Sequence, residues 1–337
     1  MKRILITGGA GFMGSWLVDY LRGKGHAVLA LDDLSGGEEE NISSKQDFIK
    51  VDLCNENKTE KIFRKFSPNL VYAFAAHPHE GLSQFCPLDV TRNTYISALS
   101  TFKVAVNSHC SKIVFASSMS RFGHGNYKPP FTEEYPRAPV DIYGIAKCAA
   151  EQALEILASI HKFSYVVLVP HNVYGGRQTR SDVYRNMLMI FAVAIMRGKP
   201  IFIYGDGEQK RAPSYIEDML EPMAKAGLDE SINEEVINLG GEKFYTINEM
   251  AQMVIDEFGL KIKPIHVADR PCEVKNAFCS VSKSQKLLDF KDKTPIKEGI
   301  HKLVEWVKYV GPKEPKYLGK LEIEEYAPEV WIKKMLK

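Results

Sequence analysis

The chain has 337 residues, 45% of them hydrophobic, which is enough for one large domain or two lobes with a sizeable core. Its 44 basic and 42 acidic residues nearly cancel, and no basic stripe of the kind that binds nucleic acid is present. Because no apolar run reaches membrane-spanning length and no signal-peptide pattern opens the chain, we expect a cytoplasmic protein with neither a membrane nor a nucleic acid as partner. The 6 cysteines include no CxxC pair and favour free thiols.

The N-terminal stretch predicts a strand that runs into a glycine turn and then a helix. The apolar run at residues 4–6 is typical of a buried parallel strand, and Gly8, Gly11 and Gly14 follow it directly. Because glycine has no Cβ, this backbone can turn tightly and bring its amides against a pyrophosphate at the positive N-terminus of the next helix. We expect that helix to begin at Ser15 and to stop at Gly23.

The next expected strand, at residues 27–31, ends in Asp32 and Asp33. An acidic residue at this point accepts hydrogen bonds from the ribose hydroxyls of adenosine and repels a 2′-phosphate. Strand, helix, second strand and acid therefore predict a dinucleotide site, and Asp32 favours NAD over NADP as the cofactor.

Strands and helices continue to alternate along the chain. In the first half we expect strands at residues 47–51, 69–76 and 112–116, and helices at 56–66, 87–107 and 141–161. In the second half we expect helices at 183–197, 217–226 and 246–258, strands at 200–204 and 235–239, and a helix-like segment at 329–337. This order predicts an α/β fold: a Rossmann-type doubly wound parallel sheet with a smaller C-terminal α/β substrate lobe.

Candidate catalytic residues lie after the fifth strand and in the helix that follows it. Ser118 comes just beyond the strand, and Tyr143 and Lys147, four residues apart, share one face of the helix. A lysine ammonium beside a phenol stabilises the phenolate, so we expect Lys147 to lower the pKa of Tyr143 toward neutrality. Alone, such a pair is usually a solvated helix face. After a dinucleotide fingerprint it is the leading catalytic pair.

These motifs resemble those of the extended short-chain dehydrogenases/reductases, in the NAD-dependent nucleotide-sugar epimerase and dehydratase branch that includes UDP-glucose 4-epimerases. The resemblance extends to about residue 310 and implies catalytic roles for Ser118, Tyr143 and Lys147. The cofactor-binding residues that it implies are Gly8, Gly11, Phe12, Met13, Gly14, Asp32, Asp33, Asp52, Leu53, Phe74, Ala75, Ala76, Asn93, Tyr143, Lys147 and Pro170.

The same resemblance assigns residues to a nucleotide-sugar substrate, for which UDP is the expected nucleotide and GDP and CDP are the alternatives. Asn172 resembles the turn into the substrate lobe, while Arg211 and Arg270 resemble the family's diphosphate contacts; Ser118 and Ser120 complete the implied set. A planar guanidinium can grip a diphosphate with two hydrogen bonds, which suits arginines in loops rich in glycine and proline.

The loop after the fourth strand is unusually polar, with His77, His79 and Glu80, and we expect it to face the substrate. These groups either recognise a carboxylated or modified sugar, or supply an extra acid or base for epimerisation at C3 or C5, or are only solvated. No downstream residue completes a set of metal ligands, so we expect no metal.

The residues after Ser118 distinguish the reactions of the resembled subfamilies, which begin with oxidation of a sugar carbon by NAD. The 4,6-dehydratases carry an Asp-Glu pair directly after the catalytic Ser or Thr, and UDP-glucuronate decarboxylases carry a Glu two residues after it. This chain has Met119 and Ser120 there, which favours epimerisation at C4. A 3,5-epimerase, a reductase, a 4,6-dehydratase and a non-catalytic NAD-binding scaffold remain alternatives.

The predicted organisation has three parts. Residues 1–170 form the NAD-binding domain, to which a strand near 235–240 returns, residues 171–310 form the nucleotide-sugar-binding lobe, and residues 311–337 form a C-terminal tail. The apolar stripe of the tail predicts packing on its own chain or on a partner subunit. The helices at 87–107 and 141–161 correspond to those that form a four-helix dimer interface in related proteins, so we expect a homodimer.

Overall fold

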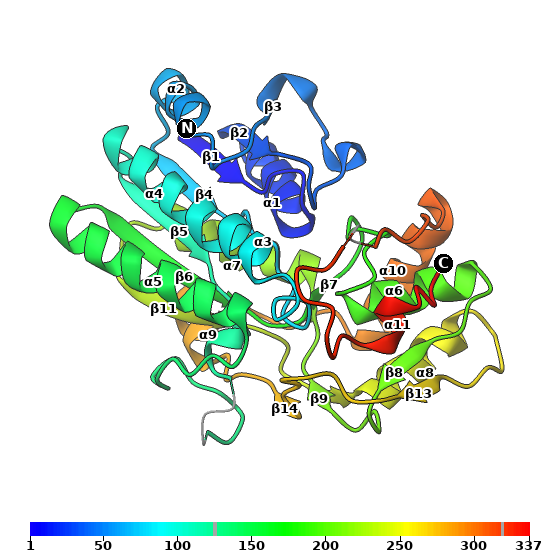
Figure 1. Cartoon of the computed structure of the whole chain (residues 1–337). Helices are drawn as coiled ribbons and strands as arrows, with labels where there is room; N and C mark the ends of the chain where they lie inside the picture. The colour runs from blue at the N-terminus through cyan, green and yellow to red at the C-terminus, as the bar shows by residue number, and fades with distance from the viewer. Residues whose placement is uncertain (124–126, 318–319) are drawn as a thin grey trace.

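The computed structural model describes residues 1–123, 127–317 and 320–337. Its centre is a seven-stranded parallel sheet with the order β11-β6-β5-β4-β1-β2-β3 (Figure 1). The strands are β1 (Arg3–Thr7), β2 (Ala27–Asp32), β3 (Phe48–Lys50), β4 (Leu70–Ala73), β5 (Lys112–Ala116), β6 (Ser164–Pro170) and β11 (Glu235–Leu239). The order reverses beside β1, and in such sheets ligands bind in the crevice at that point.

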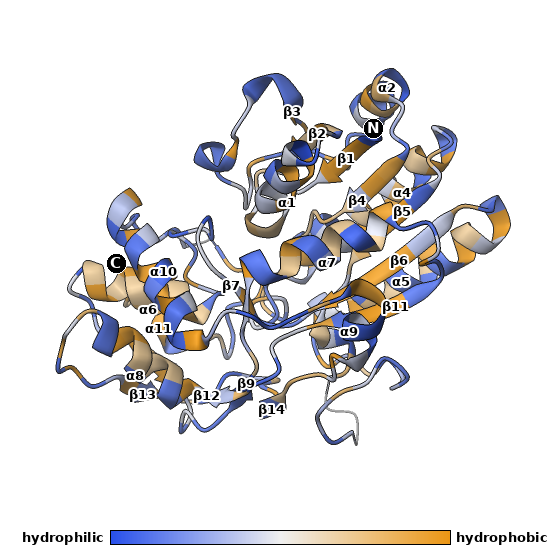
Figure 2. Cartoon of the chain, turned by 180° about the vertical axis from the view of Figure 1, so that it is seen from behind, coloured by the Kyte–Doolittle hydropathy of each residue, from blue (hydrophilic) through white to orange (hydrophobic). Residues whose placement is uncertain are grey.

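Helices cover both faces of this sheet, which is why its inner strands are mostly apolar and buried. Figure 1 has α4 and α5 in front of the sheet, and Figure 2, seen from behind, has α7 in front of it and shows the orange, hydrophobic strands. One face carries α1 (Phe12–Gly23) and α7 (Ile216–Leu228), which pack together. The other carries α2 (Glu56–Phe66), α3 (Pro87–Thr91), α4 (Ser97–Asn107) and α5 (Ile142–His161). The sheet and its helices confirm the predicted Rossmann-type fold.

A second region follows β6 and packs around an apolar helix. The helices α6 (Met187–Met196), α8 (Ile247–Glu257) and α10 (Ile296–Val310) pack against one another, and α6 is apolar on nearly all sides because the other two enclose it. Short strand pairs complete the region: β7 (Val173–Tyr174) with β10 (Ser214–Tyr215), β8 (Phe202–Tyr204) with β13 (Ile265–Val267), and β9 (Lys210–Arg211) with β12 (Tyr245–Thr246) and β14 (Asn276–Ala277). The remaining helices are α9 (Ser282–Leu288) and α11 (Glu329–Ile332).

Several predicted elements have the observed bounds, and the differences have local causes. α2, β5 and β11 begin and end where expected, and Thr246 and Glu249 form a complete capping box before α8. The helix expected at 183–197 starts only at Met187, since Asn186 has a left-handed backbone, with φ of 61°. The helix expected at 87–107 is continuous but contains a π-helical turn at Arg92–Ile96.

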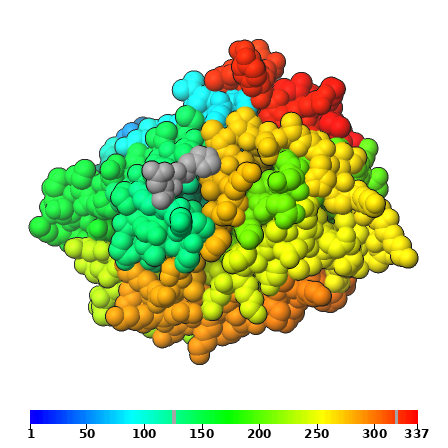
Figure 3. Space-filling view, turned by 90° about the horizontal axis from the view of Figure 1, so that it is seen from below, coloured from blue at the N-terminus to red at the C-terminus, as the bar shows by residue number. Residues whose placement is uncertain are grey.

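The C-terminal tail packs on its own chain. Ile323 N–H donates to the carbonyl of Phe85 at 3.0 Å, and the Trp331 ring contacts the rings of Phe85 and Tyr184 edge-on. The helix expected at 329–337 ends after Ile332, and Lys334 has a positive φ. Figure 3 shows the tail in red beside a cyan segment remote from it in the sequence. No helix among the described residues is long and apolar enough to cross a membrane.

Candidate active site

A cavity extends from the carboxyl ends of the sheet strands into the second region. Its lining includes every residue predicted to bind the cofactor, namely Gly8, Gly11, Phe12, Met13, Gly14, Asp32, Asp33, Asp52, Leu53, Phe74, Ala75, Ala76, Asn93, Tyr143, Lys147 and Pro170. The predicted substrate residues that line it are His77, Glu80, Ser118, Ser120, Asn172, Arg211 and Arg270. The fold thus brings to one crevice the predicted cofactor residues and all of the predicted substrate residues except His79.

The glycine turn leaves no room for side chains. A Cβ on Gly14 would lie 2.1 Å from the carbonyl oxygen of Gly8, and Gly8 itself has φ of +71° with the backbone of Ala75 beside it. Gly11 is the N-cap of α1, which begins at Phe12 rather than at Ser15 because Ser15 N–H already bonds the Gly11 carbonyl. A close backbone turn at a helix N-terminus fits the pyrophosphate of a dinucleotide.

Asp32 lines the cavity and also holds two backbone segments together. Its carboxylate accepts from the backbone N–H groups of Ala10 at 3.1 Å and Leu34 at 2.8 Å, so it ties the glycine turn to the loop after β2. Burial raises the pKa of Asp32, although these backbone donors oppose the rise. The side chain still lines the cavity, where an acidic group suits ribose hydroxyls and opposes a 2′-phosphate.

The three predicted catalytic residues meet at the carboxyl end of β5. Ser118 follows that strand, and Tyr143 and Lys147 lie on the first turns of α5, which Asp141 caps by accepting from Gly144 N–H at 2.6 Å. Lys147 Nζ donates to the carbonyl of Ala116 at 2.5 Å and lies 5.8 Å from the centre of the Tyr143 ring. Both side chains are almost fully buried.

The expected effect of Lys147 on Tyr143 is not found. Burial raises the pKa of the Tyr143 phenol above its ordinary value, and the charge of Glu80 acts in the same direction. Burial also lowers the pKa of Lys147, to about 7. Both shifts have the same physical cause, because a low-dielectric site disfavours the charged form of either group. The prediction considered only the helix face and missed the burial of that face.

The polar loop after β4 sends its side chains in three directions. His77 lies 2.9 Å from Asp89 and 2.9 Å from the Ser35 hydroxyl at the cofactor side of the cavity. Glu80 reaches into the cavity, where Ser120 Oγ donates to its Oε1 at 2.6 Å.

His79, a predicted substrate residue, does not line the cavity. It lies 2.9 Å from the buried carboxylate of Asp182. Burial alone would raise the pKa of Asp182, but His79 and Arg185 outweigh it and hold that pKa below its usual range. The contact with Asp182 thus accounts for the position of His79 outside the cavity lining.

Arg211 and Arg270, which are predicted to contact a diphosphate, lie together on the second region. Each guanidinium donates to the carboxylate of Glu273 at 2.6 Å, and that of Arg270 stacks 4.8 Å from the centre of the Tyr204 ring. The Glu273 carboxylate therefore orients both guanidinium groups on the cavity wall.

Other residues of the cavity wall were not predicted as site residues. Arg185, Tyr204 and, from the tail, Val330, Trp331 and Leu336 line it. The apolar stripe at 329–337 was the one sequence signal for the tail residues, and it predicted packing without saying against what.

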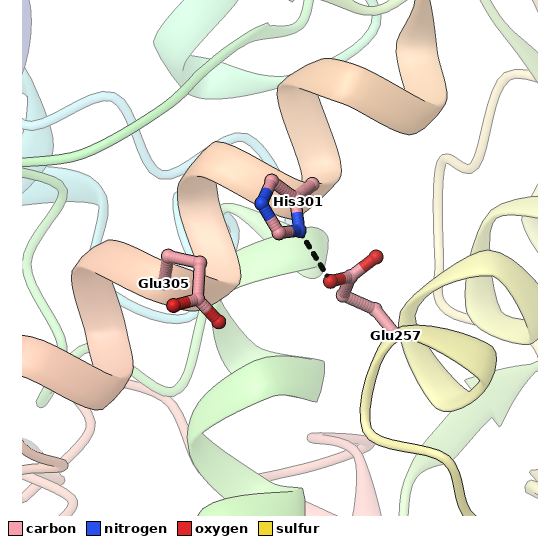
Figure 4. Close-up of side chains that lie close together, drawn as sticks. All are labelled: Glu257, His301 and Glu305. Carbon is pink, nitrogen blue, oxygen red and sulfur yellow. Dashed lines mark hydrogen bonds and ion pairs between the residues drawn. The ribbon is translucent and has the colours of Figure 1, made fainter.

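A group of metal-ligand residue types lies outside this cavity. Potential ligand atoms of Glu257, His301 and Glu305 lie within 4.8 Å of one another between α8 and α10 (Figure 4). His301 is 2.5 Å from Glu257, and Lys308 donates to Glu305 at 2.9 Å. Ion pairing across exposed helix surfaces explains this group without a metal.

Comparison with known proteins identifies the family. The model of the NAD dependent epimerase/dehydratase family matches residues 4–240. The chain belongs to this family. Its cofactor is accordingly NAD, for which the glycine turn and Asp32 supply the fitting site.

Relatives within the family differ in their reactions. The structure resembles the UDP-glucose 4-epimerase of Thermotoga maritima with UDP-glucose, at a TM-score of 0.86 and 29% identity over 91% of this chain and 99% of that one. It also resembles a Thermus thermophilus UDP-glucose 4-epimerase in complex with NAD, at a TM-score of 0.85 and 28% identity over 91% and 99% of the chains. A UDP-N-acetyl-alpha-D-glucosaminuronate decarboxylase of Bacillus cytotoxicus is 26% identical over 92% of this chain and 98% of its own length. The chain is thus similar to enzymes that catalyse different reactions.

Proposed function

We propose that the chain inverts C4 of a UDP-sugar, with NAD as a resident cofactor. The observation that carries this proposal is the meeting of Ser118, Tyr143 and Lys147 beside the glycine turn in one cavity. NAD, when bound, accepts a hydride and returns it. The glycine turn at the start of α1 and Asp32 would hold it.

The chain's own residues supply binding and proton transfer. Tyr143 takes the proton of the sugar hydroxyl at its phenolic oxygen and later returns it, while Ser118 donates a hydrogen bond to the same sugar oxygen. Because burial raises the pKa of Tyr143, the phenolate needs a nearby cation when it forms, and Lys147 on the same helix face supplies one. Arg211 and Arg270 bind the diphosphate.

Epimerisation is favoured over elimination and decarboxylation by the residues after Ser118. Met119 and Ser120 bring no acid of their own at the point where the resembled dehydratases and decarboxylases carry one. Similarity to two UDP-glucose 4-epimerase structures supports UDP as the nucleotide.

The test is incubation of the protein and NAD with UDP-glucose, UDP-galactose, UDP-N-acetylglucosamine and UDP-glucuronate, followed by mass spectrometry and NMR. We expect a product of unchanged mass that is inverted at C4, and a loss of about 1,000-fold in rate for Tyr143→Phe. The matched control is Tyr309→Phe, since Tyr309 is exposed. A product that has lost water or carbon dioxide, or full activity in Tyr143→Phe, would contradict the proposal.

We also propose a homodimer formed through α5 and its neighbours. Ile145, Ile156 and Ile160 are 52%, 60% and 64% exposed, and their spacing places them along one face of α5. Light scattering should give the mass of a dimer, and Ile156→Glu together with Ile160→Glu should give that of a monomer. A monomeric wild-type protein would contradict this assembly.

A further inference from the structure

The Glu80 side chain leaves its own loop to enter the catalytic group. Its Oε1 accepts from Ser120 Oγ at 2.6 Å and lies 3.5 Å from Ser118 Oγ. Ser118 and Ser120 are themselves 3.2 Å apart, so one carboxylate oxygen faces both hydroxyls. The segment after β4 thereby brings an acid to Ser120, where the sequence after β5 has none.

A second carboxyl group lies near the first. Asp141 lines the same cavity, and burial together with the charge of Glu80 raises the pKa of Asp141 to about 7. Two carboxylates that share a site cannot both ionise easily, so Asp141 can hold or release a proton near neutral pH beside Glu80. Arg185, Arg211 and Arg270 face the same cavity and balance the remaining negative charge.

Oxidation at C4 does not require the Glu80 carboxylate. Ser118, Tyr143 and Lys147 already supply the base and the hydroxyl contact for that step, and the charge of Glu80 opposes ionisation of Tyr143. Ser120 and Ser118 are also able to bond the sugar without it. A carboxylate that lines the cavity and works against the main base requires a separate task.

We propose that Glu80 is a second acid/base of this site, which transfers a proton to and from a carbon next to the C4 ketone of a keto-sugar. This inference rests on the proposed function, because that function creates a ketone at C4. A ketone acidifies the C–H bonds of C3 and C5. Glu80 takes the proton, the C–H electron pair forms an enolate with its charge on O4, and Ser118 and protonated Tyr143 donate hydrogen bonds to that oxygen.

The positions of Ser118 and Glu80 support this step. Where the Ser118 hydroxyl holds O4, C3 and C5 lie one bond beyond C4, and the Glu80 oxygen is 3.5 Å from that same hydroxyl. When Glu80 returns a proton, the C–H bond forms again with its original configuration, because no second acid protonates the opposite face. Since Glu80 exchanges its proton with water, the net change is replacement of that carbon-bound hydrogen by one from the solvent. The chemical class of substrate is thus a nucleotide sugar with a hydrogen on C3 or C5 next to the oxidised carbon.

The experiment supplies the ketone directly. The NAD-loaded protein is incubated in deuterated water with UDP-4-keto-6-deoxyglucose, and the H3 and H5 signals are followed by proton NMR. We expect exchange at one of these positions at least about 100-fold faster than in buffer, and a comparable loss in Glu80→Gln. Glu60→Gln, on the surface of α2, is the charge-matched control and should exchange like the wild type.

A second variant keeps the inference testable if Glu80→Gln folds poorly. Ser120→Ala removes the hydroxyl that orients Glu80 but leaves the carboxylate, and it should slow the exchange by about tenfold. Wild-type exchange no faster than in buffer would overturn the inference, as would exchange in Glu80→Gln or Ser120→Ala equal to that of the wild type.

The outcome is separable from that of the proposed function. C4 inversion of a UDP-sugar without exchange on the keto-sugar would overturn the role of Glu80 alone. Exchange on the keto-sugar without inversion of any tested UDP-sugar would overturn the C4 epimerase alone and retain Glu80 as an acid/base.

Discussion

The two ends of the cavity are built in different ways. At the cofactor end, backbone geometry makes the site: Gly8 and Gly14 touch, and Asp32 accepts from the backbone of Ala10 and Leu34. At the end proposed to bind the nucleotide sugar, called the sugar end here, charged side chains from distant segments meet, as Arg211 and Arg270 do at Glu273.

Because of this contrast, substitutions at the two ends should have different effects. A change in the backbone turn disturbs the fold of the turn itself, because no neighbouring atom can move away cheaply. A change in a paired side chain removes its contact and leaves its partner in place. Variants at the cofactor end should therefore lose both stability and NAD, while variants at the sugar end should lose substrate affinity first.

Gly14→Ala tests the cofactor end most severely. Its Cβ would lie 2.1 Å from the Gly8 carbonyl oxygen, so we expect NAD affinity to fall about 100-fold and the free energy of unfolding to fall by about 3 kcal/mol. Calorimetry with NAD and urea denaturation measure the two effects. Gly23→Ala, in the same helix with nothing within 4 Å of its Cβ, should change neither adversely. Normal NAD affinity in Gly14→Ala would show that the close backbone turn does not make the cofactor site.

Arg211→Ala tests the sugar end. Loss of one charged contact to a diphosphate should raise KM for the nucleotide sugar about 10- to 100-fold, with kcat and NAD affinity little changed. Steady-state kinetics and calorimetry distinguish these quantities. The exposed Arg64 provides the control Arg64→Ala, which should behave like the wild type. A fall in NAD affinity as large as the rise in KM would show that the two ends are not independent.

Asp141→Asn tests how a buried carboxyl group of the cavity makes stability depend on pH. The folded pKa of Asp141, about 7, lies above its ordinary value, so between pH 5 and 7 the folded chain binds more protons than the unfolded chain and loses stability as pH rises. Asparagine caps a helix as well as aspartate does. From pH 5 to 8 we expect the free energy of unfolding of the wild type, relative to Asp141→Asn, to fall on the order of 2 kcal/mol. Parallel urea-denaturation profiles of the wild type and Asp141→Asn would contradict this. The control variant is Asp256→Asn, at an exposed position of α8.

Trp331→Phe is expected to have the smallest effect. The tail side chain lines the sugar end and packs edge-on against Phe85, so a smaller ring should raise KM about threefold and leave NAD affinity unchanged. Kinetics with the reacting nucleotide sugar measure the change. Ile332→Ala, a half-exposed neighbour, is the control. A change in NAD affinity instead of KM would show that Trp331 acts at the cofactor end of the cavity, contrary to this prediction.

Sequence patterns predicted elements well where local signals decided them. The bounds of β5 and β11 follow from apolar runs, and the capping box before α8 follows from the residues that form it. The late start of α6 was missed because the left-handed backbone of Asn186 leaves only a weak signal in the sequence. Of the predicted site, His79 was placed wrongly relative to the cavity, since its buried partner Asp182 lies more than a hundred residues further along the chain.

By itself, the sequence determined the alternating order of strands and helices, the glycine turn with its acidic strand end, and the shared helix face of Tyr143 and Lys147. Each depends on residues close together in the chain, whose spacing dictates geometry. Only the tertiary structure decided the direction of the Tyr143 pKa, the meeting of Glu80 with Ser120, and the tail's contribution to the cavity. Burial and long-range pairing arise when distant segments pack together, and no local pattern encodes which segments those will be.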